Sequence, residues 1–258
     1  MTGNGFMRRG TLKTLLAGVL APFLPHPVRS QEAKKPANDD GFRLSSSNLD
    51  LASLSDEELG ARSIRPLDIG EVVIETGRVR ACDPLSYPDF SPLARTIPPG
   101  RYPVRLYFAF DRVAAAVMRI APGVPASWEP ATNDPAGKYG SMLNVGGYPV
   151  DAGMGSYMDE GVLAQMDRRI GLEQAKKPGE SINYYDDVTA EAIQANNHDW
   201  AMHKPMDDSD LNVAMFASGW GDGFYTVMWG LSADGKPLVL LTDFNVIANS
   251  DGRKEPEE

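Results

Sequence analysis

Four aspartates are the residues best placed to do chemistry in this chain, because each stands beside a turn or ends a strand-like run. They are Asp83, Asp151, Asp222 and Asp243. If the fold brings three of their carboxylates together, they could bind Ca²⁺ or Mg²⁺, which prefer hard oxygen ligands. They could also divide the roles of general acid and general base where their surroundings separate their pKa values. This arrangement would suit a hydrolase.

The alternative interpretation gives each aspartate a structural role, in which its carboxylate accepts a hydrogen bond from a nearby backbone N–H. Asp83 stands before Pro84, and Asp222 lies between two glycines, so both fit local bonding in a turn. Asp151 and Asp243 fit it less well and are therefore the candidate catalytic residues. A divalent cation stays open as a cofactor, although the ligand spacing of a calcium loop is absent.

The glycine-rich segment at residues 219–223 offers a candidate ligand site, and it reads Gly-Trp-Gly-Asp-Gly. A phosphate-binding loop would need its glycines to open a helix, whereas a strand-like run follows here and no Gly-Lys-Ser/Thr occurs. We therefore interpret the glycines as a tight or bulged connection. Trp220, Asp222 and the more distant Asp83 are the candidate ligand-binding residues.

Histidine and cysteine usage predicts no metal site. His198 and His203 are five residues apart, which on a helix places them on different faces, unlike the four-residue spacing of zinc sites. Cys82 is the single cysteine, so an intramolecular disulfide framework and cysteine clusters are excluded. We predict that Cys82 is a buried, inert thiol.

The N-terminus predicts export. Residues 8–13 read Arg-Arg-Gly-Thr-Leu-Lys, and an apolar stretch over residues 15–24 follows. This pattern describes a secretory signal peptide, here residues 1–30. The paired arginines resemble the twin-arginine signal, and an ordinary signal that holds two arginines is the alternative. About ten apolar residues are too few to cross a bilayer, so no permanent membrane anchor is expected and the predicted location is periplasmic or secreted.

The composition describes an acidic globular protein. The chain has 258 residues, of which 42% are hydrophobic and 23% are charged, and its formal net charge is −10. This apolar fraction suits a packed core. The acidic balance argues against nucleic acid as a partner, because binding phosphates needs clusters of Lys and Arg. A protein or a small molecule is the expected kind of partner.

Strand-like runs outnumber helices and predict an α+β fold built mainly on antiparallel sheet. We expect hairpins at residues 72–82 and 102–120. A three-strand antiparallel meander is expected from residue 211 to residue 247, because an Asp-Gly turn separates its last two runs. Residues 238–241 show little alternation, so this strand should be buried on both faces.

Two or three short helices accompany these strands. Ser55 and Glu58 have the capping-box spacing, which predicts a helix over residues 56–62. Apolar residues recur every four positions from Met158 to Ile170, and Asp159 could cap that helix. The predicted organisation is a signal peptide (1–30), a flexible tether with a short helix (31–62), a single globular domain (63–248) and a disordered tail (249–258).

Five segments of the chain are distinctive in combination. They are residues 77–84 (GRVRACDP), 98–104 (PPGRYPV), 150–155 (VDAGMG), 218–225 (SGWGDGFY) and 241–244 (LTDF). In this order they resemble the bacterial domain-of-unknown-function family 4241, over about residues 70 to 247. The resemblance implies no activity, cofactor or catalytic residue.

Two hypotheses of function follow. The favoured one is an exported soluble domain that binds a ligand or another protein, because Gly, Pro and aromatic residues dominate the distinctive segments. The alternative is a hydrolase-like enzyme with an aspartate cluster that depends on Ca²⁺ or Mg²⁺. The sequence leaves open whether the protein is an enzyme.

Overall fold

The computed structural model describes residues 46–137 and 146–247. The chain divides into two compact units, Met1–Gly41 and Phe42–Glu258, and every described residue belongs to the second. The predicted signal peptide, the tether up to residue 45 and the tail at 249–258 lie outside the described residues. No helix in the described part is long and apolar enough to cross a membrane.

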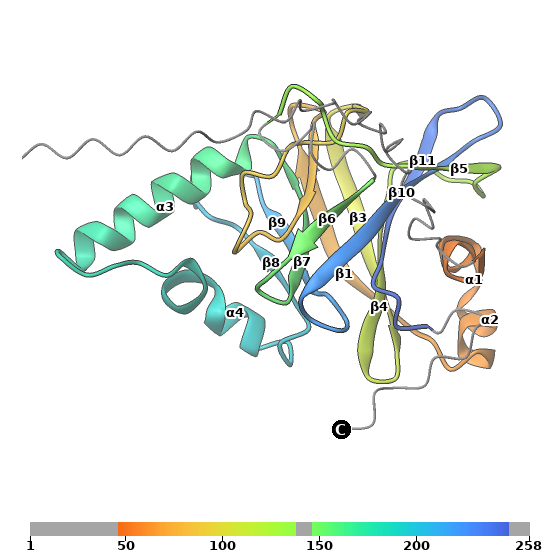
Figure 1. Cartoon of the computed structure of the whole chain (residues 1–258), viewed down its shortest axis with the longest axis horizontal. Coiled ribbons are helices and arrows are strands. Elements are labelled where there is room, and N and C mark those ends of the chain that lie inside the picture. Colours follow the sequence, from red (N-terminus) through yellow and green to blue (C-terminus); the bar gives the residue numbers. More distant parts are fainter. Residues whose placement is uncertain (1–45, 138–145, 248–258) are drawn as a thin grey trace, which may run out of the picture. The chain divides into compact units, whose positions relative to one another are not determined.

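Two antiparallel sheets form the described unit (Figure 1). Sheet A has the order β1-β3-β4-β11-β10-β5, and β6 also pairs with β10. Its strands are β1 (Arg65–Ile74), β3 (Gly100–Ala109), β4 (Arg112–Arg119), β5 (Ser127–Pro130), β6 (Gly147–Val150), β10 (Gly223–Leu231) and β11 (Pro237–Asp243). Sheet B has the order β2-β7-β9-β8. Its strands are β2 (Val79–Cys82), β7 (Met154–Asp159), β8 (Trp200–His203) and β9 (Val213–Ala217).

The helical elements are short except for one. They are α1 (Ser46–Leu49), the 3₁₀ helix η1 (Asp50–Ser53), α2 (Asp56–Ala61), α3 (Val162–Lys176), the π-helix η2 (Tyr185–Thr189) and α4 (Ala190–Gln194). In Figure 1, α1 and α2 lie on one side of the sheets and α3 and α4 on the other. The mainly antiparallel α+β class predicted from the sequence is therefore confirmed.

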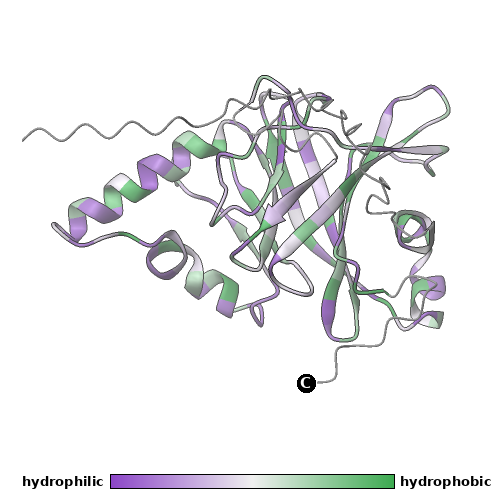
Figure 2. Cartoon of the chain, in the orientation of Figure 1, coloured by the Kyte–Doolittle hydropathy of each residue, from purple (hydrophilic) through white to green (hydrophobic). Residues whose placement is uncertain are grey.

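The main core lies between the two sheets, where β1 and β4 of sheet A contact strands of sheet B. Hydrophobic residues concentrate along these strands in Figure 2. A polar contact also crosses this core, because the Tyr157 hydroxyl on β7 donates to the Ala116 carbonyl oxygen on β4 at 2.9 Å. The inner faces of the two sheets therefore pack against each other and are also joined by a hydrogen bond.

Part of the outer face of sheet A is buried as well, because η1 and α2 pack against it. Leu51 and Leu59 pack there against Val239 and Leu241 of β11, while Leu240 points into the main core. The prediction that residues 238–241 are buried on both faces is confirmed. The predicted capping box is also confirmed: Ser55 Oγ accepts from the Glu58 N–H, and the Glu58 carboxylate accepts from the Ser55 N–H at 2.8 Å.

The hairpin predicted at residues 102–120 and the one at the Asp-Gly turn are confirmed. The hairpin predicted at residues 72–82 is wrong. β3 pairs with β4, and β10 pairs with β11. β1 and β2 do not pair with each other, because β1 joins β3 in sheet A and β2 joins β7 in sheet B. Between them the chain crosses from one sheet to the other at Gly77, which has φ +78°. The buried Asp159 carboxylate holds this crossing by accepting from the Glu75 and Thr76 N–H groups.

Replacing Gly77 with Ala is expected to lower the free energy of unfolding by about 3 kcal/mol. A Cβ at Gly77 would lie 2.5 Å from the Ile97 carbonyl oxygen, and the positive φ adds a strain of roughly 1–2 kcal/mol. Gly235→Ala is the matched control, since its φ is +77° and nothing lies within 4 Å of its Cβ. Urea unfolding measures both variants; an equal loss in the two would show that the Ile97 contact contributes nothing.

The predicted three-strand meander is wrong in its first strand, β9, which belongs to the other sheet. β9 pairs with β7 and β8 in sheet B instead of joining β10, so the segment 218–222 carries the chain from sheet B to sheet A. Gly219 makes this crossing at φ +68°, where a Cβ would lie 2.8 Å from the Val113 carbonyl oxygen. The glycines therefore serve a tight connection, as the sequence indicated, but one between sheets.

The long helix α3 begins later than predicted. Met158 and Asp159 end strand β7, and the helix starts at Val162 without a side-chain cap. Asp159 therefore does not cap the helix; its Oδ1 accepts from the Gly161 N–H, which precedes the helix. Val162 is buried, while Ile170 is 36% exposed, because α3 leaves the core as it proceeds. The sequence also predicts a weaker helix from Val188 to Ala195, and this segment is formed by η2 and α4.

Candidate functional site

Asp83 joins two loops at one end of sheet B. Its carboxylate is buried and directly follows β2. Oδ1 accepts from the N–H groups of Leu85 and Ser86 at 2.9 and 3.1 Å, and Oδ2 accepts from those of Asp151 and Ala152 at 2.9 and 2.7 Å. Four charge-assisted hydrogen bonds thus hold the loop after β2 against the turn before β7. The Oδ1 bonds are the local turn bonds that the alternative interpretation describes, whereas the Oδ2 bonds join distant segments.

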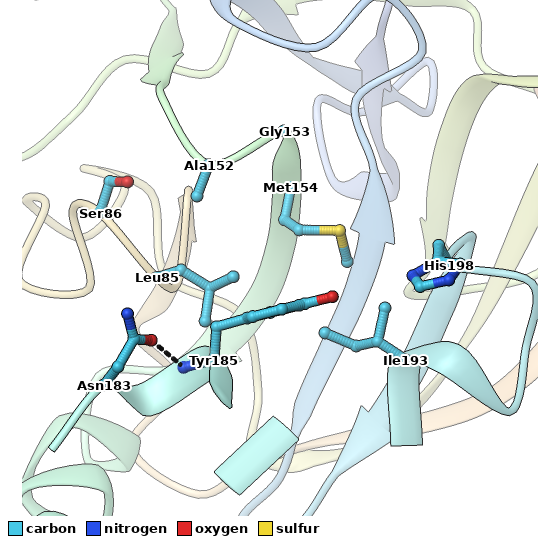
Figure 3. Close-up of a pocket in the computed structure, with 9 residues that line it drawn as sticks. All are labelled: Leu85, Ser86, Ala152, Gly153, Met154, Asn183, Tyr185, Ile193 and His198. Atoms are coloured by element: carbon cyan, nitrogen blue, oxygen red, sulfur yellow. Dashed lines mark hydrogen bonds between the residues drawn. The ribbon is translucent and has the colours of Figure 1, made fainter. Parts of the chain in front are cut away.

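A pocket of about 490 Å³ opens beside this pair of loops (Figure 3). One wall comes from the loops that Asp83 joins and from the start of β7, through Leu85, Ser86, Ala152, Gly153 and Met154. The opposite wall comes from the segment between α3 and β8, through Asn183, Tyr185, Ile193 and His198. The volume lies within the range of ligand pockets, roughly 300–1,000 Å³.

The wall that carries Tyr185 is an unusual helical turn. η2 is a π-helix, and such turns are rare and often lie at functional sites. The Asn183 side chain begins it, because Oδ1 accepts from the Tyr185 and Asp186 N–H groups at 2.9 and 3.2 Å. In Figure 3 the Tyr185 ring extends across the pocket between Leu85 and Ile193. The π-helix thereby places an aromatic ring in the lining of the cavity.

A buried pair anchors this helical wall to sheet B. The Tyr184 hydroxyl and His203 Nε2 lie 2.8 Å apart, and their rings meet edge to face. Burial lowers the pKa of His203 to about 4, and the Arg169 charge acts in the same direction. Burial also raises the pKa of the Tyr184 phenol. Both groups are therefore neutral at pH 7, and their hydrogen bond fixes the residue that precedes Tyr185.

His198 reaches the pocket from a strained backbone. Asn197 and His198 have φ of +56° and +65°, a left-handed conformation that costs an ordinary residue roughly 1–2 kcal/mol. The His198 N–H donates to the Ile193 carbonyl oxygen at 3.0 Å, which closes the end of α4. Such outliers persist where the surrounding structure holds them, and they cluster at ligand sites.

Several polar groups that line the pocket make no hydrogen bond in the part of the chain that the structure describes. They are the Ser86 hydroxyl, the Asn183 Nδ2 amide, the Tyr185 hydroxyl and the His198 ring. Each of these groups can hydrogen-bond to a molecule in the cavity. The apolar side chains between them, such as Leu85 and Met154, complete the mixed lining that is typical of small-molecule sites.

Comparison with known proteins finds a family whose model covers the residues of this pocket. The family model described as "Protein of unknown function (DUF4241)" matches residues 72–242, which is most of the described structure and includes every residue that lines the pocket. The chain belongs to the DUF4241 family. The resemblance found in the sequence is thus confirmed. Searches of the curated proteins and of the solved structures found no match.

The DUF4241 fold brings Asp151 close to Asp83 and, through the pairing of Val150 with Gly223 in the β6–β10 ladder, close to Asp222. Asp151 donates its N–H to Asp83, but its own side chain is exposed at the pocket's outer turn. Asp222 is exposed in the connection between the sheets. Asp243 is buried on the outer face of sheet A, where Oδ2 accepts from Asn48 Nδ2 at 2.7 Å and Oδ1 from the Asn245 N–H at 2.8 Å. Burial raises the pKa of Asp243 to about 6.

A metal site is not assembled in residues 46–137 and 146–247, where no three His, Cys, Asp or Glu side chains gather around one point. Cys82 is buried, as predicted, and burial raises the pKa of its thiol to about 12. A thiol with this pKa stays protonated and unreactive at neutral pH.

Trp220 belongs to a different surface of the DUF4241 domain. Its ring is 39% exposed, the Arg112 guanidinium lies 4.5 Å from the ring centre, and Nε1 donates to the Asn245 carbonyl oxygen at 3.2 Å. It does not line the pocket. Sequence reasoning missed Tyr185 and Asn183, and it considered His198 only as a metal ligand. The run Asn196-Asn197-His198 carried one usable signal, because Asn and His tolerate the left-handed conformation.

Proposed function

We propose that this protein is an exported binding module that takes a small, uncharged ligand in the pocket beside Asp83. The observation that carries the proposal is the set of polar groups that make no hydrogen bond within the described residues, led by the Tyr185 hydroxyl and the His198 ring, and that line a cavity with apolar walls. Fixed walls support it, because the Asp83 carboxylate and the Tyr184–His203 pair hold the two sides before any ligand arrives. Such preorganisation lowers the entropic cost of binding.

Binding fits this geometry better than hydrolysis. A nucleophile and its base must lie within hydrogen-bonding reach of each other. Ser86 and His198 are a serine and a possible base among the residues that line the pocket, and Figure 3 shows them on opposite sides with Tyr185 between them. Asp83 cannot act as their base, because its two oxygens already accept four backbone hydrogen bonds.

Methyl NMR of the methionines tests the pocket. The protein labelled with ¹³C at its methionine methyl groups is titrated with a library of uncharged polar fragments. Binders are expected to move the Met154 signal and to leave the signal of Met118 unchanged, since only Met154 lines the pocket. Tyr185→Ala is expected to weaken such binding about tenfold or more, and Trp220→Ala to leave it unchanged. A library that never moves the Met154 signal contradicts the proposal.

Export rests on residues 1–30 and is tested separately. In a bacterial host, the wild-type protein is expected outside the cytoplasm with Gln31 at its N-terminus. Changing both Arg8 and Arg9 to Lys is expected to retain the precursor in the cytoplasm, because the twin-arginine route requires that pair. Export that survives this double change would identify an ordinary signal peptide. A wild-type protein that stays uncleaved in the cytoplasm would overturn export itself.

A further inference from the structure

We infer that the ligand of this pocket is a neutral sugar whose ring stacks on Tyr185. The inference rests on the proposed function, and it adds the chemical class of the ligand. It follows from three properties of the pocket: the absence of charge among the residues that line it, the kind of hydrogen bond that its polar groups make, and the placement of its aromatic ring.

Charge excludes most ionic ligands. None of the residues that line the pocket is an Asp, Glu, Lys or Arg. The described carboxylates near the lining are Asp83, whose oxygens are engaged by four N–H groups, Asp151, which is exposed at the turn, and Asp199, which follows His198 and interacts with it electrostatically. A phosphate or carboxylate would find no Lys or Arg in the lining and would meet these acids nearby, which is unfavourable.

The polar groups themselves select a ligand that both donates and accepts. The hydroxyls of Ser86 and Tyr185 can each donate and accept, whereas Asn183 offers only its Nδ2 donor, because its Oδ1 already accepts from two N–H groups. Phosphate and carboxylate only accept, and ammonium only donates. Hydroxyl groups are the ligand groups that match such a mixed set of partners, and a sugar ring carries several of them around its edge.

The Tyr185 ring supplies the complementary apolar contact. A pyranose ring has a C–H face as well as its hydroxyl edge, and aromatic rings present a flat face of negative potential to which C–H groups are attracted. Tyr185 lies across the pocket in Figure 3, with its hydroxyl directed toward the side where Met154, Ile193 and His198 lie. The backbone that carries the ring is held before binding, because Asn183 Oδ1 accepts from the Tyr185 N–H.

The test compares sugars that differ mainly in charge. Glucose, galactose, mannose and N-acetylglucosamine are titrated into the labelled protein beside glucuronate, glucosamine and glucose 6-phosphate, and the Met154 methyl signal is followed. At least one neutral sugar is expected to move it, and the charged relatives are expected to bind about tenfold more weakly or not at all. Nucleosides and short amides of similar size form the comparison set.

Two variants of one residue separate stacking from hydrogen bonding. Tyr185→Phe keeps the ring and is expected to weaken sugar binding only a few-fold, whereas Tyr185→Leu is expected to weaken it about tenfold or more. Unchanged methionine spectra away from Met154 show that both variants fold. Equal loss in the two variants, or preference for a charged sugar, overturns the inference.

The outcomes also distinguish this inference from the proposed function. If nucleosides or amides move the Met154 signal and sugars do not, the pocket binds ligands and the assignment to sugars is wrong. If no compound of either set or of the fragment library moves it, both fail.

Discussion

Asp83→Asn is expected to lower the free energy of unfolding by about 4 kcal/mol and to loosen one wall of the pocket. The asparagine keeps one oxygen for two backbone N–H groups but turns an NH₂ group toward the other two. Two buried N–H donors then lose their acceptor, and each such loss costs roughly 1–3 kcal/mol, with bonds to a charged group at the upper end. Urea unfolding measures the stability, and the NMR relaxation of the Met154 methyl group measures the mobility of this pocket wall.

Asp159→Asn is the matched control for this change. The Asp159 carboxylate is equally buried and accepts from the Glu75, Thr76 and Gly161 N–H groups and the Thr76 hydroxyl, at the crossing between the sheets. We expect a similar loss of stability in both variants, but a change in Met154 relaxation and in ligand affinity only in Asp83→Asn. If both variants alter the pocket equally, the special role of Asp83 there is wrong.

His203 and Asp243 are expected to have opposite effects on stability as the pH changes. The pKa of His203 is lowered from 6.5 to about 4, so the unfolded chain binds the extra proton and stability is lost as the pH falls through this window. The pKa of Asp243 is raised from 3.8 to about 6, so the folded chain binds the extra proton and stability is lost as the pH rises. Between pH 4 and 6 the two effects largely cancel.

Single variants separate the contributions of His203 and Asp243 to the pH dependence of stability. Asp243→Asn leaves only the His203 effect, and its stability relative to wild type should improve by about 3 kcal/mol from pH 4 to pH 7. The Asn also retains an acceptor for the Asn245 N–H, and its NH₂ group can donate to the Asn48 Oδ1, a buried oxygen that has no partner.

His203→Gln leaves only the Asp243 effect, and its stability relative to wild type should fall by about 3 kcal/mol over the same range. Glutamine keeps a hydrogen-bonding group near Tyr184. Thermal unfolding from pH 4 to pH 7.5 measures both variants and their combination. Parallel curves for wild type and either variant would show that the substituted group does not titrate in this range.

The local patterns of the sequence predicted the local structure well. The capping box of Ser55 and Glu58 spans three residues, and the Asp-Gly turn before β11 spans four, so both depend on neighbours along the chain. Half of the bonding of Asp83 is equally local, because its Oδ1 accepts from the N–H groups two and three residues ahead. A turn role for Asp83 could therefore be predicted from its position before Pro84.

The other half of that bonding could not be predicted. The Asp83 Oδ2 accepts from the N–H groups of Asp151 and Ala152, which are 68 and 69 residues away. No sequence pattern in either segment predicts that the two segments meet. The same reason explains the two corrected strand pairings. Runs of strand-forming residues predict strands at 72–74, 79–82 and 211–217, but the choice between sheet A and sheet B depends on where Gly77 and Gly219 turn the chain.

By itself, then, the sequence determined the helix α2, the hairpins β3–β4 and β10–β11, the antiparallel class, the burial of β11 on both faces, the buried thiol and the family, because each depends on composition or on near neighbours. Only the tertiary structure decided that the aspartates do not gather and that Tyr185, His198 and the Asp83 loops enclose one cavity. It also decided the shifted pKa values of His203 and Asp243, since burial follows from packing between segments far apart in the chain.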